Sequence, residues 1–342
     1  MTTTRWHVGR RVKTKQPTAS VLAKLVAGLL ALTLIAAACG DDDDGGTQST
    51  GDTQSSDDSA GSGSDTADFD GTLRIGAIPD QDPERLQRTY DLVAEHLEQA
   101  LPGVTVEYVP VTDYAGAVAG FRVGDLDAVW FGGLTGVQAR LEVDGAVAVA
   151  QRDIDERFTS VFIAGADTGI TPFDDVSGLS AVAGRSFTFG SESSTSGRLM
   201  PQSFLAEAGV DVDSDLAGAP GFSGSHDATI EVVTAGAYEV GALNSQVWDS
   251  RLEEGVIDTS KVVEVFRTPT YYDYHWVAQP DLDARFGDGF TERFVAALTS
   301  LDPADAEQAE ILELFGAGGF IETNNTNYDA IERVGREAGL IR

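Results

Sequence analysis

The sequence is poor in the residues that most often carry catalytic or metal chemistry. It has one cysteine, Cys39, so no disulfide can form within the chain. Its four histidines lack metal-ligand spacing, and no His-Glu-x-x-His, Gly-x-Ser-x-Gly, Ser-x-x-Lys or Gly-x-x-x-x-Gly-Lys motif occurs. The sequence therefore predicts no metal site, no cofactor and no enzyme of these classes.

Positive charge is also scarce. Residues 71–342 hold 45 acidic against 17 basic residues, a formal charge of −28, and Lys261 is the one lysine that follows Cys39. Nucleic acid is excluded as a partner, because no basic patch is available to meet phosphates. An anionic ligand would have to be held by local dipoles inside a cleft, since the overall field repels it.

The N-terminal region lacks an apolar run of membrane-spanning length. Leu25 to Ala38 is apolar for 14 residues, short of the roughly 20 that a transmembrane helix needs. A basic start and the small residues before Cys39 are instead typical of a bacterial lipoprotein signal peptide over 1–38, with lipid on Cys39. The alternative is an ordinary secreted protein with a free cysteine.

Residues 39–70 resemble a linker. The segment 40–70 has ten acidic residues, no basic ones, and is otherwise mostly Gly, Ser, Thr and Ala. Such a composition cannot bury a core and predicts a disordered, self-repelling tether. We therefore expect a protein that is extracytoplasmic and anchored by lipid to the bacterial cell membrane, at the cell surface or in the periplasm.

The remaining residues alternate between strand and helix patterns. This βαβ rhythm predicts an α/β fold of two lobes, each a mostly parallel sheet flanked by helices, with a ligand cleft between them. Lobe 1 is expected over 71–164 and 271–342, and lobe 2 over 165–270. The chain would then cross between the lobes near residues 164 and 270.

One loop in the predicted second lobe has the character of an anion receptor. Phe187 and Phe189 alternate as in a strand, then Gly190-Ser-Glu-Ser-Ser-Thr-Ser-Gly197 makes a turn, and an apolar helical stripe follows. Unpaired N–H groups and the positive dipole end of a helix start, together with hydroxyl donors, suit an anion. The alternative is a plain serine N-cap on a surface loop.

Several motifs occur in an order that identifies a family: Gly76-Ala-Ile-Pro79, Phe121-Arg-Val-Gly-Asp-Leu-Asp127, Trp130-Phe-Gly-Gly133, Gly190 to Gly197, and Ser223-Gly-Ser-His-Asp227. With them the chain resembles substrate-binding lipoproteins of phosphate/phosphite/phosphonate ABC importers. More narrowly, it resembles the branch described as selenate-binding. The resemblance implies a small oxyanion ligand, a permease and an ATPase as partners, and a monomer with the periplasmic-binding-protein (type II) fold.

The resemblance also implies site residues. Ser194, Thr195 and Ser196 match the run that takes the phosphonate oxygens, His226 matches a histidine that contacts the anion, and Tyr114 matches an aromatic lining the cleft. Asn244 stands where binders of amino-phosphonates use a carboxylate, and Asp273 is a carboxylate nearby. Without that acid an ammonium group loses a partner, which favours a bare oxyanion such as selenate, phosphite or a sulfate-like species. The expected function is capture of a tetrahedral oxyanion, namely selenate, phosphite or a phosphonate.

Three other functions stay open on the sequence. A receptor for sulfonate, nitrate or a thiamine precursor would share the fold and differ in cleft chemistry. A secreted hydrolase is the enzyme alternative. A ligand-sensing module that docks a membrane kinase would differ only in its partner.

Overall fold

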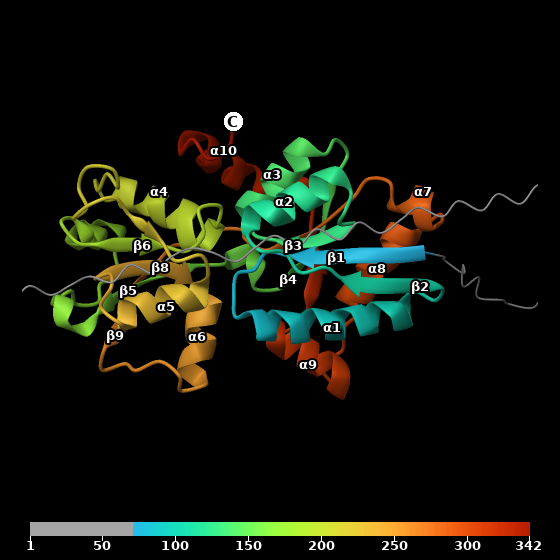
Figure 1. The fold of residues 1–342 in the computed structure, drawn as a ribbon, viewed down its shortest axis with the longest axis horizontal. Helices are drawn as coiled ribbons and strands as arrows, with labels where there is room; N and C mark the ends of the chain where they lie inside the picture. The colour runs from blue at the N-terminus through green and yellow to red at the C-terminus, as the bar shows by residue number, and fades with distance from the viewer. Residues whose placement is uncertain (1–70) are drawn as a thin grey trace, which may run out of the picture. The chain divides into compact units, whose positions relative to one another are not determined.

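The computed structural model describes residues Gly71–Arg342, and the predicted signal peptide, Cys39 and the linker lie outside the described residues. Figure 1 shows two groups of elements, each built on its own sheet. The predicted two-lobe α/β architecture is confirmed. None of the described helices combines the length and the apolar character needed to cross a bilayer.

The first sheet has six strands in the order β11-β4-β10-β3-β1-β2. Its strands are β1 (Gly71–Ala77), β2 (Val104–Tyr108), β3 (Ala128–Phe131), β4 (Val147–Arg152), β10 (His275–Ala278) and β11 (Phe320–Glu322). The helices of this lobe are α1 (Pro83–Ala100), α2 (Tyr114–Val123), α3 (Gly133–Glu142), α7 (Leu282–Phe286), α8 (Phe290–Thr299), α9 (Ala306–Phe315) and α10 (Asp329–Glu337).

The second sheet has five strands in the order β7-β6-β8-β5-β9. These are β5 (Ser160–Gly165), β6 (Phe187–Phe189), β7 (Gly221–Phe222), β8 (Val240–Asn244) and β9 (Val262–Arg267). The helices are α4 (Met200–Glu207), α5 (His226–Thr234) and α6 (Ser245–Glu253), with a single π-helical turn at Thr195–Leu199 before α4. Short 3₁₀ turns lie at Asp155–Arg157, Ala166–Thr168, Val176–Val182 and Asn325–Tyr328.

Two details of the prediction are wrong. Strand β5 pairs with β8 and β9, so the chain has entered the second lobe before Ser160 and not near residue 164. The sheets are also mixed and not mostly parallel, since β10 runs antiparallel to both β3 and β4, and β5 runs antiparallel to both of its neighbours. Both differences have the same cause. Strands β5 and β10 each follow directly after the chain crosses between the lobes, so neither is reached through the helix of a βαβ unit, which would make it parallel to its neighbours.

Buried aromatic side chains fill the space between the first sheet and its helices. Trp276 and Tyr90 are fully buried and meet edge to face, with ring centroids 6.2 Å apart. Trp130, 4% exposed, stacks on Tyr274 with centroids 5.8 Å apart. The apolar positions at helical spacing in α1, including Leu86, face this core. Dense packing of these side chains therefore holds the strand ends that carry the polar site in fixed positions.

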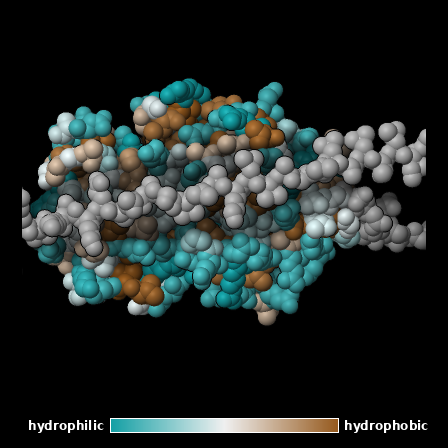
Figure 2. All heavy atoms as spheres, viewed as in Figure 1, coloured by the Kyte–Doolittle hydropathy of each residue, from teal (hydrophilic) through white to brown (hydrophobic). Residues whose placement is uncertain are grey.

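On the face shown in Figure 2, hydrophilic spheres predominate, while hydrophobic ones gather over α3 and α10. The exposed apolar residues of α2 and α3 include Val123 and Leu141, which are 62% and 50% exposed. They do not mark the ligand site, whose residues are buried.

Helix α3 approaches β10 closely because Gly136 has no side chain. A Cβ at this position would collide with the buried imidazole of His275. That ring cannot move aside, because it stacks on Tyr328 at 3.7 Å between centroids and its Nδ1 bonds the backbone carbonyl of Asp273 at 3.1 Å. Gly136 thus fixes the distance of α3 from the strand that follows Asp273.

We expect Gly136→Ala to lower the free energy of unfolding by about 1–3 kcal/mol, the usual cost of overpacking a core. Urea unfolding of the residue 71–342 domain measures it. Gly218→Ala is the matched control, because a Cβ there meets no atom within 4 Å. A Gly136→Ala protein as stable as the control would contradict the packing argument.

Candidate ligand-binding site

The hydroxyl loop, Gly190–Gly197, joins β6 to the helix start as the sequence predicts. Gly190 N–H donates to Gly197 O at 2.8 Å, which closes the loop on itself. Ser194 is the N-cap, and its Oγ accepts the Gly197 N–H at 2.9 Å. The N–H groups of Thr195 and Ser196 lie in the first turn and have no acceptor within the helix. The loop is therefore both a cap and a set of donors.

Thr195 connects this loop to the other lobe. Its Oγ1 accepts the N–H of Leu134, in the first turn of α3, at 2.9 Å. Asp273, in the segment that crosses back to lobe 1, accepts the Gly133 N–H with Oδ1 at 2.9 Å. A Cβ on Gly132 would lie 3.1 Å from Thr195 Oγ1 and 3.4 Å from Asp273 Oδ1, so the three meet at one point.

Buried polar atoms without a partner gather around this point. Among the described residues, the hydroxyl of Tyr114, the Oγ of Ser196 and the Oδ2 of Asp273 have no partner at full hydrogen-bond geometry, although Ser194 lies near the Tyr114 hydroxyl and Ser196 near the Asp273 carboxyl. Their side chains belong to residues that are 2%, 1% and 0% exposed. Buried polar groups are nearly always paired, because an unpaired one loses its hydration without compensation. These three groups are available to a ligand.

Burial shifts the pKa values at this point. It raises the pKa of Asp273 to about 7, which the Gly133 N–H offsets only in part and the negative charge of Asp155 increases further. Burial also raises the pKa of Tyr114 well above its ordinary value. Near neutral pH the tyrosine is therefore a neutral donor, and the aspartate holds a proton about half of the time.

His226 and Asn244 lie beside the hydroxyl loop and are tied together. The His226 Nδ1 accepts the backbone N–H of Asn244 at 3.3 Å. The proton of the neutral ring is therefore on Nε2, which lies 3.1 Å from the Tyr274 hydroxyl. Asn244 caps α6 with Oδ1, 2.9 Å from Val247 N, and donates from Nδ2 to Tyr274 at 3.0 Å. Burial lowers the pKa of His226 to about 4, so the ring is neutral at physiological pH.

Tyr274 and Asp80 are site residues that the sequence analysis missed. The Tyr274 hydroxyl donates to Asp80 Oδ2 at 2.9 Å and accepts from His226 and Asn244 of the second lobe. The backbone carbonyl of Asp80 also accepts the backbone N–H of His226, at 2.9 Å. The available signal for Asp80 was its place just after a strand at the carboxyl edge of a sheet, where α/β proteins bind ligands.

The predicted residues therefore divide into two connected groups. Tyr114, Ser194, Thr195, Ser196 and Asp273 surround the start of α3. His226 and Asn244 form a second group with Tyr274, and His226 Cε1 lies 3.2 Å from a Cβ position on Gly197, which joins the two groups. Arg198 stays outside both, with its guanidinium over the Phe189 ring at 4.4 Å.

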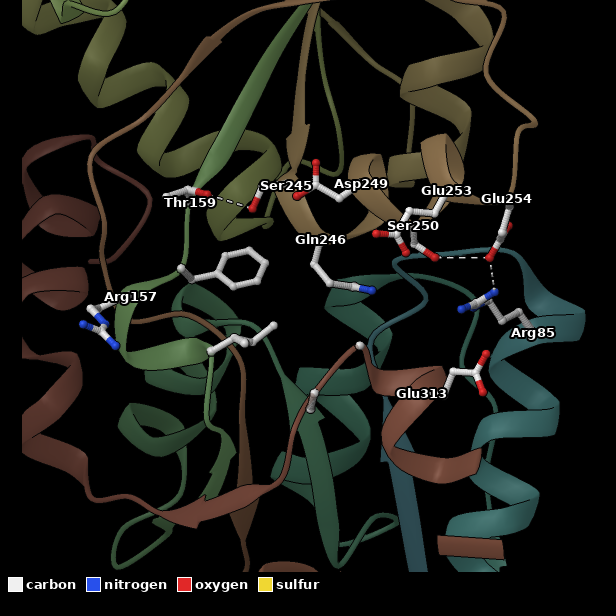
Figure 3. Close-up of a pocket in the computed structure, with 14 residues that line it drawn as sticks. Arg85, Arg157, Thr159, Ser245, Gln246, Asp249, Ser250, Glu253, Glu254 and Glu313 are labelled. Carbon is white, nitrogen blue, oxygen red and sulfur yellow. Dashed lines mark hydrogen bonds and ion pairs between the residues drawn. The ribbon is translucent and has the colours of Figure 1, made fainter. Parts of the chain in front are cut away.

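A separate groove of about 760 Å³ lies between α6 and lobe 1, as Figure 3 shows. It is open and bordered by Glu253, Glu254 and Glu313, and Arg85 of α1 pairs with Glu254 across it at 2.9 Å. No residue of the hydroxyl loop lines it. Because acidic side chains border it, this groove suits an anion poorly. The groove is therefore not the candidate site.

Comparison with known proteins agrees with this geometry. Residues 75–328 match the model of a family described as ABC transporter, phosphonate, periplasmic substrate-binding protein. The chain belongs to this family. It is therefore a substrate-binding component and not an enzyme, and it acts outside the cytoplasm. The described residues also contain no group of three metal-ligating side chains.

Two relatives are informative. A protein described as probable ABC transporter phosphite binding protein PhnD1, of Prochlorococcus marinus MIT 9301, is 46% identical over 270 residues, which cover 79% of this chain and 91% of that protein. The phosphate-import protein PhnD of Mycolicibacterium smegmatis is 31% identical over 229 residues, covering 61% and 68%. The solved structure of PhnD1 with methylphosphonate matches with a TM-score of 0.76 at 44% identity, covering 79% of this chain and 99% of that one.

The shifted pKa of Asp273 predicts how stability depends on pH. Its folded-state pKa of about 7 lies above the ordinary 3.8. The folded state thus binds more protons between pH 4 and 7, and the contribution of this group is present below pH 4 and lost as pH rises through 7. Asp273→Asn keeps an acceptor for Gly133 N–H, and it should stabilise the ligand-free domain by about 2–4 kcal/mol at pH 8 and by less at pH 5.

Urea unfolding of the ligand-free protein at pH 5 and pH 8 measures this difference. Asp174→Asn, at an exposed carboxylate, is the control and should show no such pH dependence. If Asp273→Asn were equally stabilising at both pH values, its carboxyl would not titrate near 7.

Proposed function

We propose that this chain is the receptor lipoprotein of an ABC importer, which captures a phosphorus oxyanion such as phosphite or a phosphonate and delivers it to the permease and ATPase. The observation that carries the proposal is the set of unpartnered hydroxyls around a helix start between two lobes. The names of the relatives support the ligand class, and selenate stays a prediction to be tested beside it.

The donors fit a tetrahedral oxyanion. Each oxygen of such an anion is an acceptor, and hydrogen bonds to charged acceptors are the stronger ones. Ser196 Oγ, the Tyr114 hydroxyl and the first-turn N–H groups of the hydroxyl loop would hold the oxygens. Ser194 and Thr195 would shape the loop and add their hydroxyl protons, while the neutral ring of His226, whose two nitrogens are taken by Asn244 and Tyr274, would line the site.

Asn244 supports an anion without an attached ammonium group. Its amide is used on both sides, by the cap of α6 and by Tyr274, and it carries no charge. Asp273 and Asp80 are the remaining carboxyls, and burial raises the pKa values of both, to about 7 and about 6. Asp80 already accepts the Tyr274 hydroxyl and Asp273 the Gly133 N–H, so an amino-phosphonate is less well matched than methylphosphonate or phosphite.

We expect Tyr114→Phe and Ser196→Ala each to weaken methylphosphonate or phosphite binding roughly ten-fold or more. Each deletes one bond to a charged ligand, which typically contributes about 1.5–3 kcal/mol. Because both hydroxyls are unpartnered in the protein itself, neither change should lower its stability. Isothermal titration calorimetry with phosphite, methylphosphonate, phosphate, sulfate and selenate tests the site and ranks the ligands.

Ser193→Ala is the matched control. Ser193 lies in the same loop but borders a groove with α2, α3 and the C-terminus on another side, and its affinity should equal that of the wild type. Unchanged affinity in the Tyr114→Phe/Ser196→Ala double variant would place the ligand elsewhere. Tight binding of sulfate or selenate with none of a phosphorus oxyanion would favour the other receptor classes.

We propose further that the mature protein is a monomer tethered by lipid on Cys39. The support is the lipoprotein-type sequence around Cys39 and the acidic linker, whose self-repelling composition would hold the folded domain away from the membrane surface. In the native host, Cys39→Ser should move the protein from the membrane fraction to the soluble extracytoplasmic fraction. Retention of Cys39→Ser in the membrane fraction would contradict lipid anchoring, with Ser49→Ala in the linker as a control that should stay membrane-bound.

A further inference from the structure

The π-helical turn that leads from the hydroxyl loop into α4 contains a backbone carbonyl that its own helix cannot satisfy. The Met200 N–H bonds the Thr195 carbonyl, five residues back. The next bond of this series would join the Ser196 carbonyl to the N–H of residue 201. That residue is Pro201, which has no N–H. The Ser196 carbonyl therefore needs a donor from another element.

Strand β5 of the same lobe supplies that donor. The Ser160 hydroxyl lies 2.7 Å from the Ser196 carbonyl oxygen and 2.6 Å from the Tyr271 hydroxyl. Ser160 has one hydroxyl proton and a carbonyl can only accept, so this proton goes to Ser196. Tyr271 must then donate its own proton to the Ser160 oxygen. The three groups form a chain of hydrogen bonds that runs in one direction, from Tyr271 through Ser160 to Ser196.

This hydrogen-bond chain is buried. Ser160 and Ser196 are 0% and 1% exposed, and Tyr271 is 9% exposed. Burial raises the pKa of Tyr271 well above its ordinary value, so the phenol keeps the proton that it donates. A buried carbonyl that loses its donor costs free energy, because no water replaces the bond. Without the Ser160 hydroxyl, the Ser196 carbonyl could regain a partner only through a change in the shape of the turn.

The chain begins where the two crossings between the lobes are paired. The Tyr271 N–H donates to the Phe158 carbonyl, and the Tyr271 carbonyl accepts the Phe158 N–H, both at 2.9 Å. Ser160 begins β5 two residues after Phe158. This short bridge therefore places both hydroxyls of the chain, and the position of Ser196 depends on the paired crossings.

We propose that Ser160 and Tyr271 are positioning residues for ligand binding. They fix the peptide of Ser196, and with it the Ser196 Oγ, in the space that this oxygen shares with the Tyr114 hydroxyl. Neither would touch the ligand, because the one hydroxyl proton of each is already bonded. Single π-helical turns are frequent at functional sites. The inference rests on the proposed function, in which Ser196 Oγ holds a ligand oxygen.

Calorimetric titration of the purified protein with methylphosphonate tests the proposal. Ser160→Ala should weaken binding about five- to ten-fold, because the Ser196 carbonyl loses its donor. Tyr271→Phe should weaken it less, about two- to three-fold, because Ser160 can still donate to Ser196. Tyr328→Phe is the matched control. It removes a buried tyrosine hydroxyl that donates to Gln151 at 3.1 Å in lobe 1, and its affinity should equal that of the wild type.

A second background separates positioning from a general loss of stability. Pro201→Ala restores an N–H that can bond the Ser196 carbonyl in the π-helical series. In that background Ser160→Ala should weaken methylphosphonate binding less than about two-fold, against about five- to ten-fold when Pro201 is present. A purely structural role of Ser160 would give no such dependence on residue 201. Urea unfolding of each variant reports stability separately.

The outcomes separate this inference from the proposed function. Wild-type affinity in Ser160→Ala would overturn the inference, and so would an equal loss of affinity in both backgrounds. The receptor function stands in either case, since the wild type binds methylphosphonate. A wild type that binds no phosphorus oxyanion would instead overturn the proposed function, and this inference with it. Should Ser160→Ala fail to fold, Tyr271→Phe decides, because an affinity equal to that of Tyr328→Phe would contradict the chain.

Discussion

Four helix starts meet at the junction of the lobes, and the rest of the site depends on that convergence. The starts of α3, the Thr195 turn, α5 and α6 are linked by contacts from Leu134 to Thr195, from Gly197 to His226 and from His226 to Asn244. Each start has a positive dipole end and unpaired N–H groups. In a domain of net charge −28 with one lysine, this is the positive potential that is available to an anion.

The caps of these helices explain why the site uses small polar residues. Ser194, Ser225 and Asn244 cap their own helices, while Thr195 of lobe 2 and Asp273 of the segment that crosses back to lobe 1 supply acceptors to α3. Capping satisfies part of each helix start and leaves the remaining donors pointing to the same space. Because Thr195 comes from lobe 2 and α3 from lobe 1, completing the cap of α3 requires the lobes to be in contact. The contact between the lobes therefore lies next to the hydroxyls that we propose as ligand donors.

The sequence predicted the local part of this arrangement well. The strand, the turn and the helix start around Ser194 follow from patterns a few residues long. The boundary near residue 164 and the mostly parallel sheets were wrong, because strand pairing across a crossing depends on partners more than 70 residues away, such as Val161 with Leu243. Asp80 and Tyr274 were missed for the same reason, since 194 positions separate them in the chain.

The sequence by itself determined the class of the protein: its charge excludes nucleic acid, its motifs and their order give the family, and the hydroxyl loop gives an anion-binding helix start. Those features are local or compositional, so folding does not change them. The tertiary structure decided which hydroxyls are left unpartnered, that His226 is neutral and held by Tyr274, and that Asp273 is buried with one oxygen free. Desolvation and hydrogen-bond partners come from the packing of both lobes around a side chain, which no short stretch of sequence contains.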